Sequence, residues 1–249
     1  MPAIREEALC LRTWEWSETS QTACLFTEGR GILKGLAKGS RRERSPFGGG
    51  FELLTRGELL AIAKPAGQLT TFTAWDLIEP FRPLRSALPA FYAGLYLADV
   101  TMHMLSEADP HPAAYSALLL ALRSLNQPLH TMAIVAWFQW RLLEDAGYRP
   151  DLLHLVGTST PTPDEGTLIF DPTRGGFLLD AQSGPSQRPP WRMRVETLQF
   201  LRVLDSSLAP ENIPNPADPS ANRSARFLAA WIREITGVDL PTYPPLFGT

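Results

Sequence analysis

The chain has 249 residues, a formal net charge of -3 and a 44% share of hydrophobic residues, which is the composition of a globular protein with a substantial core. It contains no run of about 18 apolar residues, which excludes a transmembrane helix of ordinary length. The length predicts two domains. The N-terminal residues lack an apolar stretch, so we expect no signal peptide. Cys10 and Cys24 lie in strand-like segments, so we expect them to be buried in a cytoplasmic protein.

The first eighty residues predict short β-strands separated by turns. The expected strands are 8–14, 22–27, 31–37, 51–63 and 69–74. Five strands with glycines at the bends and one long connection are typical of a small closed Greek-key barrel. The pattern does not distinguish an OB-fold from an SH3-like barrel.

A basic stretch stands out within this region. Six basic residues fall within fifteen positions, and they are Arg30, Lys34, Lys38, Arg41, Arg42 and Arg44. Residues 32–39 have the composition of a strand, and residues 40–50 have the Gly, Ser and Pro content of a loop. A strand that leads into a flexible basic loop beside Phe47 would follow a polyanion's backbone and offer a stacking surface. The alternative is a solvated basic loop without a partner.

Prolines at positions 80 and 83 indicate a boundary between a domain at 1–80 and a second one at 81–249. Apolar residues at helical spacing predict helices near 86–105, 112–125, 129–146, 192–204 and 222–236. Between the third and fourth of these helices, residues 168–171 and 177–179 predict a small hairpin. We expect an extended tail after residue 237. The fold class is therefore α+β.

Catalytic motifs are not found. The segment from Gly35 to Ser40 lacks the order of a phosphate-binding loop, and the four histidines are scattered. We therefore expect non-covalent binding, no enzymatic activity and no cofactor. Trp14 and Trp16 alternate near a strand end and share a face, for which core or barrel-rim packing is favoured over base stacking.

Several motifs occur together in an order that resembles one known family. They are Leu11-Arg12-Thr13, Ser17-Glu18-Thr19-Ser20, Leu25-Phe26-Thr27, Ala37-Lys38-Gly39-Ser40-Arg41-Arg42, Phe51-Glu52-Leu53-Leu54, Glu79-Pro80-Phe81, Pro150-Asp151-Leu152 and Gly175-Gly176. Over most of residues 5 to 205 the sequence resembles the RecO family of bacterial recombination mediators. The order and spacing of the motifs carry this resemblance, and no single motif decides it.

The resemblance implies a five-stranded OB-fold barrel at 1–80 and a helical domain at 81–249, with a hairpin insertion at about 151–190. It implies a cytoplasmic, nucleoid-associated protein that binds single- and double-stranded DNA and anneals complementary strands. Its implied partners are RecR and the C-terminal tail of single-stranded DNA-binding protein, with RecA loading as the outcome and no membrane contact. The DNA-binding role falls on Lys38, Arg41 and Arg42, with Arg30, Lys34, Arg44 and Phe47 as neighbours.

Two further expectations concern the helical domain. The aromatic run from Trp137 to Trp140 favours core packing with one exposed ring. The alternative is that an exposed ring beside Arg141 receives a partner's apolar C-terminus, and helical spacing then selects Leu118, Leu122, Trp137 and Arg141 as the candidate site. Many family members bind zinc through two Cys-x2-Cys pairs, and the matching positions here are Leu155, Thr158, Leu179 and Gln182. None of these side chains supplies a thiolate, so we predict no structural metal and apolar packing in its place.

Two other functions remain open. The first is a protein-interaction adaptor, in which the barrel binds a RecR-like partner and DNA binding is only incidental. An oligosaccharide-binding or hydrolytic enzyme would need paired carboxylates on the barrel face, which we do not find in the sequence.

Overall fold

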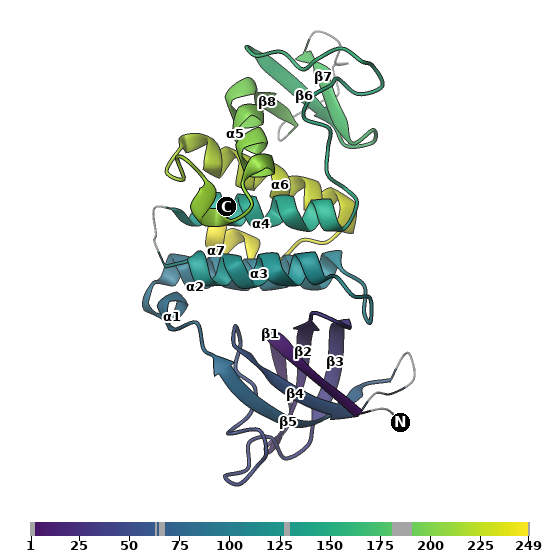
Figure 1. Cartoon of the computed structure of the whole chain (residues 1–249), viewed down its shortest axis with the longest axis vertical. Helices are drawn as coiled ribbons and strands as arrows, with labels where there is room; N and C mark the ends of the chain where they lie inside the picture. Colours follow the sequence, from purple (N-terminus) through teal and green to yellow (C-terminus); the bar gives the residue numbers. More distant parts are fainter. Residues whose placement is uncertain (1–2, 63, 65–67, 127–129, 181–190, 249) are drawn as a thin grey trace.

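The N-terminal region is a closed five-stranded barrel in the computed structural model, which describes residues 3–62, 64, 68–126, 130–180 and 191–248 (Figure 1). The strands are β1 (Ala3–Ser17), β2 (Ser20–Thr27), β3 (Gly31–Ala37), β4 (Arg56–Ile62) and β5 (Thr70–Glu79). Their order around the barrel is β1-β2-β3-β5-β4, and only the β3–β5 pair is parallel. This closure is that of an OB-fold.

Two strands differ from their predicted bounds. β4 begins at Arg56, whereas residues 51–55 form a loop, because Phe51 is drawn into the barrel and Gly50 has a φ of 110° that no strand accommodates. β1 extends to Ser17 and forms a long hairpin with β2. The predicted end of the fourth strand at residue 63 lies outside the described residues.

The barrel core consists of the inward-facing side chains of alternating strand positions. It contains Ile4, Ala8, Cys10, Ala23, Leu25, Leu33, Ala37, Phe47, Phe51, Leu59, Ala61, Phe72 and Trp75. Gly35 faces this core, and a Cβ there would lie 2.4 Å from the Phe72 ring. The absence of a side chain at Gly35 therefore lets Phe72 cross the interior.

The helices stack in layers above the barrel (Figure 1). They are α1 (Arg82–Ser86), α2 (Leu88–Met104), α3 (Pro112–Ser124), α4 (Thr131–Asp145), α5 (Val195–Ser206), the 3-10 helix η3 (Pro210–Asn212), α6 (Pro219–Thr236) and α7 (Tyr243–Phe247). Pro112 opens α3 and Gly237 ends α6 in the left-handed conformation. The tail contains the short helix α7, where the sequence predicted an extended segment. Residue 129, the predicted start of the third helix, is outside the described residues.

The barrel and the helices share one apolar core. The outer face of β1–β3 contributes side chains to the same cluster as α2, α3 and α4. The rings of Phe26 on β2 and Tyr115 on α3, for example, meet edge to face with centroids 5.5 Å apart. β5 ends at Glu79 and α1 begins at Arg82, so the predicted boundary near residue 80 falls between these elements. The barrel is therefore fixed against the helices by burial as well as by the chain.

The segment after α4 forms a small sheet of β6 (Thr167–Asp171), β7 (Gly176–Leu179) and β8 (Arg192–Arg194) in the order β7-β6-β8. Phe170 of β6 packs its ring against Phe177, Trp191, Phe227 and Trp231 at centroid distances of 5.0 to 5.6 Å. This aromatic cluster attaches the sheet to α6.

The positions that the family resemblance assigns to zinc ligands have mixed surroundings. Leu155 is buried and bridges to Phe177, Leu179 is partly buried, and Thr158 is exposed. Gln182 lies outside the described residues. Within the described part of the chain, no group of three or more His, Cys, Asp or Glu side chains could hold a metal ion.

The remaining sequence expectations have simple outcomes. Cys10 and Cys24 are free and buried as predicted, and burial raises the pKa of the Cys24 thiol to about 12. No helix among the described residues is long and apolar enough to span a bilayer.

Candidate nucleic-acid interface

A buried glutamine fixes the loop that follows β3. Gln21 on β2 accepts hydrogen bonds at Oε1 from the Ser40 hydroxyl (3.1 Å) and the Phe51 amide (3.0 Å). Its Nε2 donates to the Phe51 carbonyl at 3.2 Å. Buried amides bonded in this way hold a backbone in one conformation. These hydrogen bonds tie Ser40 and Phe51, near the two ends of the loop from 38 to 55, to the same side chain of β2.

Phe47 lies inside the barrel rather than on its surface. Only 3% of it is exposed, and its ring centroid is 5.6 Å from that of Phe51. Gly48, Gly49 and Gly50 all have positive φ, which reverses the chain so that both phenylalanines point inward. The prediction that Phe47 offers a stacking surface is therefore wrong.

Four cations are presented on the outside of this fixed loop. Lys38, Arg41, Arg42 and Arg44 are all exposed. Arg41 Nη1 lies 2.8 Å from Glu15 Oε1, an exposed pair that contributes little to stability and is exchangeable for a phosphate. No described acidic side chain lies within ion-pairing distance of the other three. The loop therefore offers a group of cations to an anionic ligand.

The other two cations of the basic stretch lie away from the loop: Arg30 directly precedes β3, and Lys34 is at the middle of this strand. Arg30 Nε is 2.8 Å from Glu6 Oε1, and Lys34 Nζ is 2.6 Å from Glu107 Oε1. The hydrogen bond to Glu107 raises the pKa of Lys34. Because Glu107 follows α2, Lys34 joins the barrel to the helical layer. The structure thus gathers four of the six predicted cations and separates two.

Trp14 and Trp16 are exposed, contrary to the prediction that favoured core or rim packing. Their exposed fractions are 41% and 61%. Both lie where β1 runs past its predicted end, and Trp14 pairs with Thr22 on the outer face of the hairpin. The strand register is interrupted between Glu15 and Ser17, so the shared face of the two rings stays a prediction, and alternation in the sequence does not indicate which face of a strand is covered.

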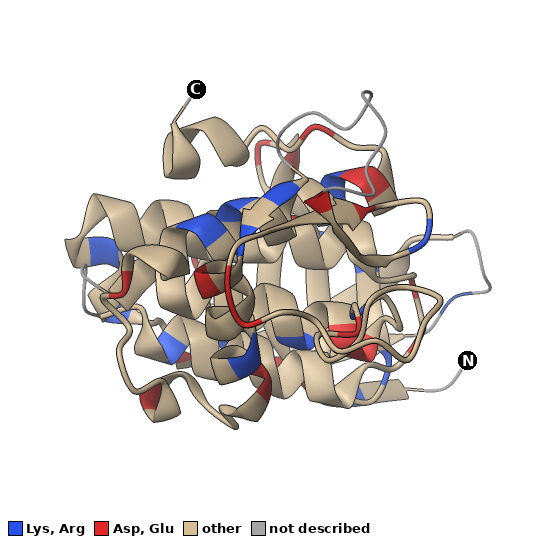
Figure 2. Cartoon of the chain, turned by 90° about the horizontal axis from the view of Figure 1, so that it is seen from above, with Lys and Arg blue, Asp and Glu red and all other residues tan. Residues whose placement is uncertain are grey.

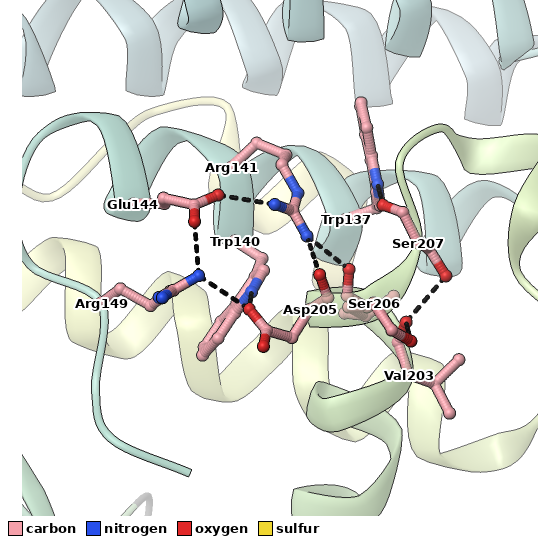
Figure 3. A network of polar contacts seen from close by, with 10 residues as sticks. Trp137, Trp140, Arg141, Glu144, Arg149, Val203, Asp205, Ser206 and Ser207 are labelled. Atoms are coloured by element: carbon pink, nitrogen blue, oxygen red, sulfur yellow. Dashed lines mark hydrogen bonds and ion pairs between the residues drawn. The ribbon is translucent and has the colours of Figure 1, made fainter.

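The predicted partner pocket in the helical domain does not exist as an open site. Leu118, Leu122 and Trp137 are buried, because helices α3 and α4 are covered by neighbouring layers on more than one side. The indole Nε1 of Trp137 donates to the Ser207 carbonyl at 2.8 Å (Figure 3). The prediction of an exposed ring at this position is wrong.

Arg141 binds the end of a neighbouring helix. Its Nη2 donates to the carbonyls of Leu204 (2.7 Å) and Asp205 (2.6 Å), which are among the last residues of α5 (Figure 3). A guanidinium at a helix C-terminus satisfies free carbonyls and complements the helix dipole. Arg149 adds a bridge between Glu144 and Asp205. This network holds α4 against α5.

Charge elsewhere on the molecule is mixed. Figure 2 shows basic and acidic positions interspersed along the ribbon in the view from above. Exposed ion pairs of this kind contribute to solubility more than to recognition. The basic loop brings four cations together around one exposed acid, Glu43.

The fold and the loop define an OB-barrel protein with a cationic site that is complementary to an anionic polymer. The family model described as "Recombination protein O N terminal" matches residues 1–81, and the one described as "Recombination protein O C terminal" matches residues 85–217. The chain belongs to the RecO family, as the resemblance of its motifs predicted.

Individual relatives agree with this assignment. The chain is 31% identical to DNA repair protein RecO of Salinibacter ruber over 74% of this chain and 70% of the relative. It is 32% identical to DNA repair protein RecO of Rhodopirellula baltica over 88% of this chain and 80% of the relative. For DNA repair protein RecO of Cutibacterium acnes the identity is 28%, over 82% of both chains.

Proposed function

We propose that this chain acts in DNA repair as a recombination mediator that binds single- and double-stranded DNA and anneals complementary strands. In this proposal it works with RecR to load RecA onto DNA coated with single-stranded DNA-binding protein. The observation that carries the proposal is the group of exposed cations Lys38, Arg41, Arg42 and Arg44 on one fixed loop. The names of the relatives support the repair role.

The proposed mechanism is electrostatic and breaks no covalent bond. Two complementary strands repel each other through their phosphates, and cations that neutralise phosphates release condensed counterions. Each phosphate contact should contribute a slope of roughly -0.7 on single strands and -0.9 on duplex in the dependence of log K on log salt. A loop held rigid by Gln21 loses little conformational entropy when it binds.

The test is annealing of complementary oligonucleotides coated with single-stranded DNA-binding protein, without ATP or added metal, at low and moderate salt. The wild type should accelerate annealing, with an effect that fades with salt. The double variant Lys38→Glu/Arg41→Glu should lose the acceleration. A matched control, Arg82→Glu/Arg194→Glu, makes the same charge change at exposed positions of the helical domain and should retain it. Equal activity in the wild type and the loop variant would refute the proposed DNA site.

A protein adaptor is the second candidate, and one observation favours it. Arg30, Lys34 and Arg41 already have acidic partners, which lowers the positive field of the barrel. An adaptor would bind RecR but show no annealing and only a shallow salt dependence. The annealing experiment, followed by a RecR binding measurement, separates the two functions.

A further inference from the structure

Two tryptophan rings project from the hairpin next to the basic loop. Trp14 and Trp16 are among the exposed large apolar side chains of the described residues, at 41% and 61%. Leaving exposed indole surface in water is costly, since each ring has a large apolar area. The neighbourhood of these rings indicates what covers them.

The hairpin and the basic loop form one surface. The Arg41 amide donates to the Thr19 carbonyl at 3.1 Å, and the Gly39 amide donates to the Ser20 hydroxyl at 3.0 Å. Both acceptors lie at the turn between β1 and β2, directly after Trp16 and Ser17. The loop cations are therefore held beside the tryptophans by backbone contacts.

Strand register places the Trp14 ring on the outer face of the barrel, and Trp16 follows two residues later at an irregularity of the strand. Trp14 pairs with Thr22, and Thr22 pairs with Leu36 on β3, so the three side chains point to the same side. Two strand spacings separate Trp14 from Leu36, which is roughly 10 Å. Lys38 follows two residues after Leu36, just past the end of β3. A ligand of modest length would therefore contact the rings and the cations together.

We propose that Trp14 and Trp16 stack on unpaired bases of a single strand whose phosphates lie along Lys38, Arg42 and Arg44. This inference rests on the proposed DNA-binding function. It adds that the protein prefers single-stranded DNA to duplex DNA. Bases in a duplex are already stacked on one another, so an exposed indole gains a partner only from an unpaired base. The cations would hold either form of DNA, and the rings would favour the single strand.

The surroundings of the rings favour a nucleic acid over an apolar protein surface. The Arg12 guanidinium lies 5.3 Å from the Trp14 ring centroid, and the residue paired with Trp14 is the polar Thr22. Aromatic rings interleaved with cations are complementary to a chain of phosphates and flat bases. Glu15 and Glu18 lie on the same hairpin, so we expect the phosphates to run on the loop side of the rings.

Arg12 acts as a positioning residue for Trp14. One Arg12 nitrogen lies 3.8 Å from Oδ1 of the buried Asp99 on α2, which anchors the guanidinium to the helical layer. The same guanidinium contacts the Trp14 ring. The ring is thus supported on one side by a group that is itself held in place.

The experiment compares three ligands of equal length: an oligothymidylate, an abasic oligonucleotide and a duplex. The wild type should bind the oligothymidylate more tightly than the abasic strand, since both carry the same phosphates. The double variant Trp14→Ala/Trp16→Ala should lose this preference, by roughly five- to 150-fold for each base that stacks. Its affinity for the abasic strand and the duplex should stay within about two-fold of the wild type. Intrinsic tryptophan fluorescence should be quenched by the oligothymidylate in the wild type and less in the variant.

Two controls accompany this variant. Tyr148→Ala removes an exposed ring of similar exposure from the helical domain and should change none of the three affinities. Trp14→Phe/Trp16→Phe retains flat rings and should keep most of the preference. Circular dichroism and the Tm should match the wild type in all variants, because the replaced side chains are exposed.

The outcomes separate the inference from the function on which it rests. If the affinity depends on Lys38 and Arg41 but the tryptophan variant behaves as the wild type, the stacking inference is wrong and the DNA function stands. An equal loss on all three ligands would also refute it, because the rings would then not read unpaired bases. Absence of DNA binding in the wild type would refute both.

Discussion

The two ends of β3 carry the same residue types in different surroundings. Arg30, directly before the strand, is paired with Glu6 of β1, and Lys34, at the middle of the strand, is paired with Glu107 after α2. Beyond its end, Lys38, Arg42 and Arg44 are exposed and have no acidic partner among the described residues. One end of the strand belongs to the junction with the helices, and the other faces solvent.

This difference shows that a basic run in a sequence has no single role. A cation that already has a carboxylate partner must give it up before it binds a phosphate, so its net gain is small. A cation without a carboxylate partner has no such contact to give up. When it binds a phosphate it releases counterions condensed on the DNA, and the full free-energy gain of that release goes to binding. The following predictions test this division between a structural end and a ligand-binding end.

The largest effect should come from the structural end. Gly31 has a φ of 64°, and a Cβ there would lie 1.8 Å from the Asp109 carbonyl oxygen. Gly31→Ala should lower the free energy of unfolding by about 2–5 kcal/mol, from left-handed strain and displacement of the α2–α3 loop. Gly48→Ala is the matched control in the basic loop, where φ is 58° and no atom lies within 4 Å of the added Cβ. It should cost only about 1–2 kcal/mol in urea unfolding. Equal costs would contradict the division.

Neutralising the unpaired cations of the loop should weaken DNA binding far more than neutralising the paired cations Arg30 and Lys34. The triple variant Lys38→Gln/Arg42→Gln/Arg44→Gln should lose roughly four-fold in single-strand affinity per phosphate contact at about 0.15 M salt, or roughly 50-fold in total. The salt slope should fall by about 2. The double variant Arg30→Gln/Lys34→Gln should change affinity less than about two-fold and cost up to about 1 kcal/mol of stability per pair. Fluorescence anisotropy with a labelled oligonucleotide measures both, and similar losses in the two variants would argue against the separation.

Acid should lower the stability that the junction between the barrel and the helices contributes through Glu79. Hydrogen bonds from Arg123 and from Arg56 lower the pKa of Glu79 at the end of β5. A carboxylate whose folded pKa is below its unfolded value stabilises the protein above the unfolded pKa, and this contribution is lost as the pH falls through the folded pKa. The free energy of unfolding should therefore fall between about pH 5 and pH 3, and by about 1 kcal/mol less in Glu79→Gln. Urea unfolding across this range measures it, and identical profiles would show that Glu79 is not coupled to folding.

The smallest effect should come from metal removal. A chelator should leave the Tm unchanged, because the position that the family resemblance assigns to a zinc ligand is held by the buried Leu155, which forms a β-bridge with Phe177. Added zinc should likewise have no effect. A chelator-dependent drop in Tm, together with zinc in the purified protein by elemental analysis, would contradict this prediction.

Local patterns identified most of the elements. Alternating residues predicted β2 and β3 closely, and helical periodicity with Pro112 and Gly237 at the ends predicted α3 and the end of α6. These features depend on interactions within a few residues, which a sequence displays directly. The order of several motifs also indicated the family, which the matches to its two models confirmed.

Exposure was the least predictable property. The rings of Phe47 and Trp137 were expected outside and are buried, and those of Trp14 and Trp16 were expected to be packed and are exposed. An aromatic side chain suits a core and a binding surface equally well. The outcome depended on which neighbours arrive from distant parts of the chain.

The sequence by itself determined the elements, the fold class, the family and the presence of a basic stretch, because these follow from local spacing and composition. Only the tertiary structure decided which cations are free, that Gln21 fixes the loop, and that the hairpin rings lie beside it. Each of these depends on a contact between residues far apart in the chain, such as Lys34 with Glu107 or Gln21 with Phe51. Such contacts exist only once the barrel has closed and packed against the helices.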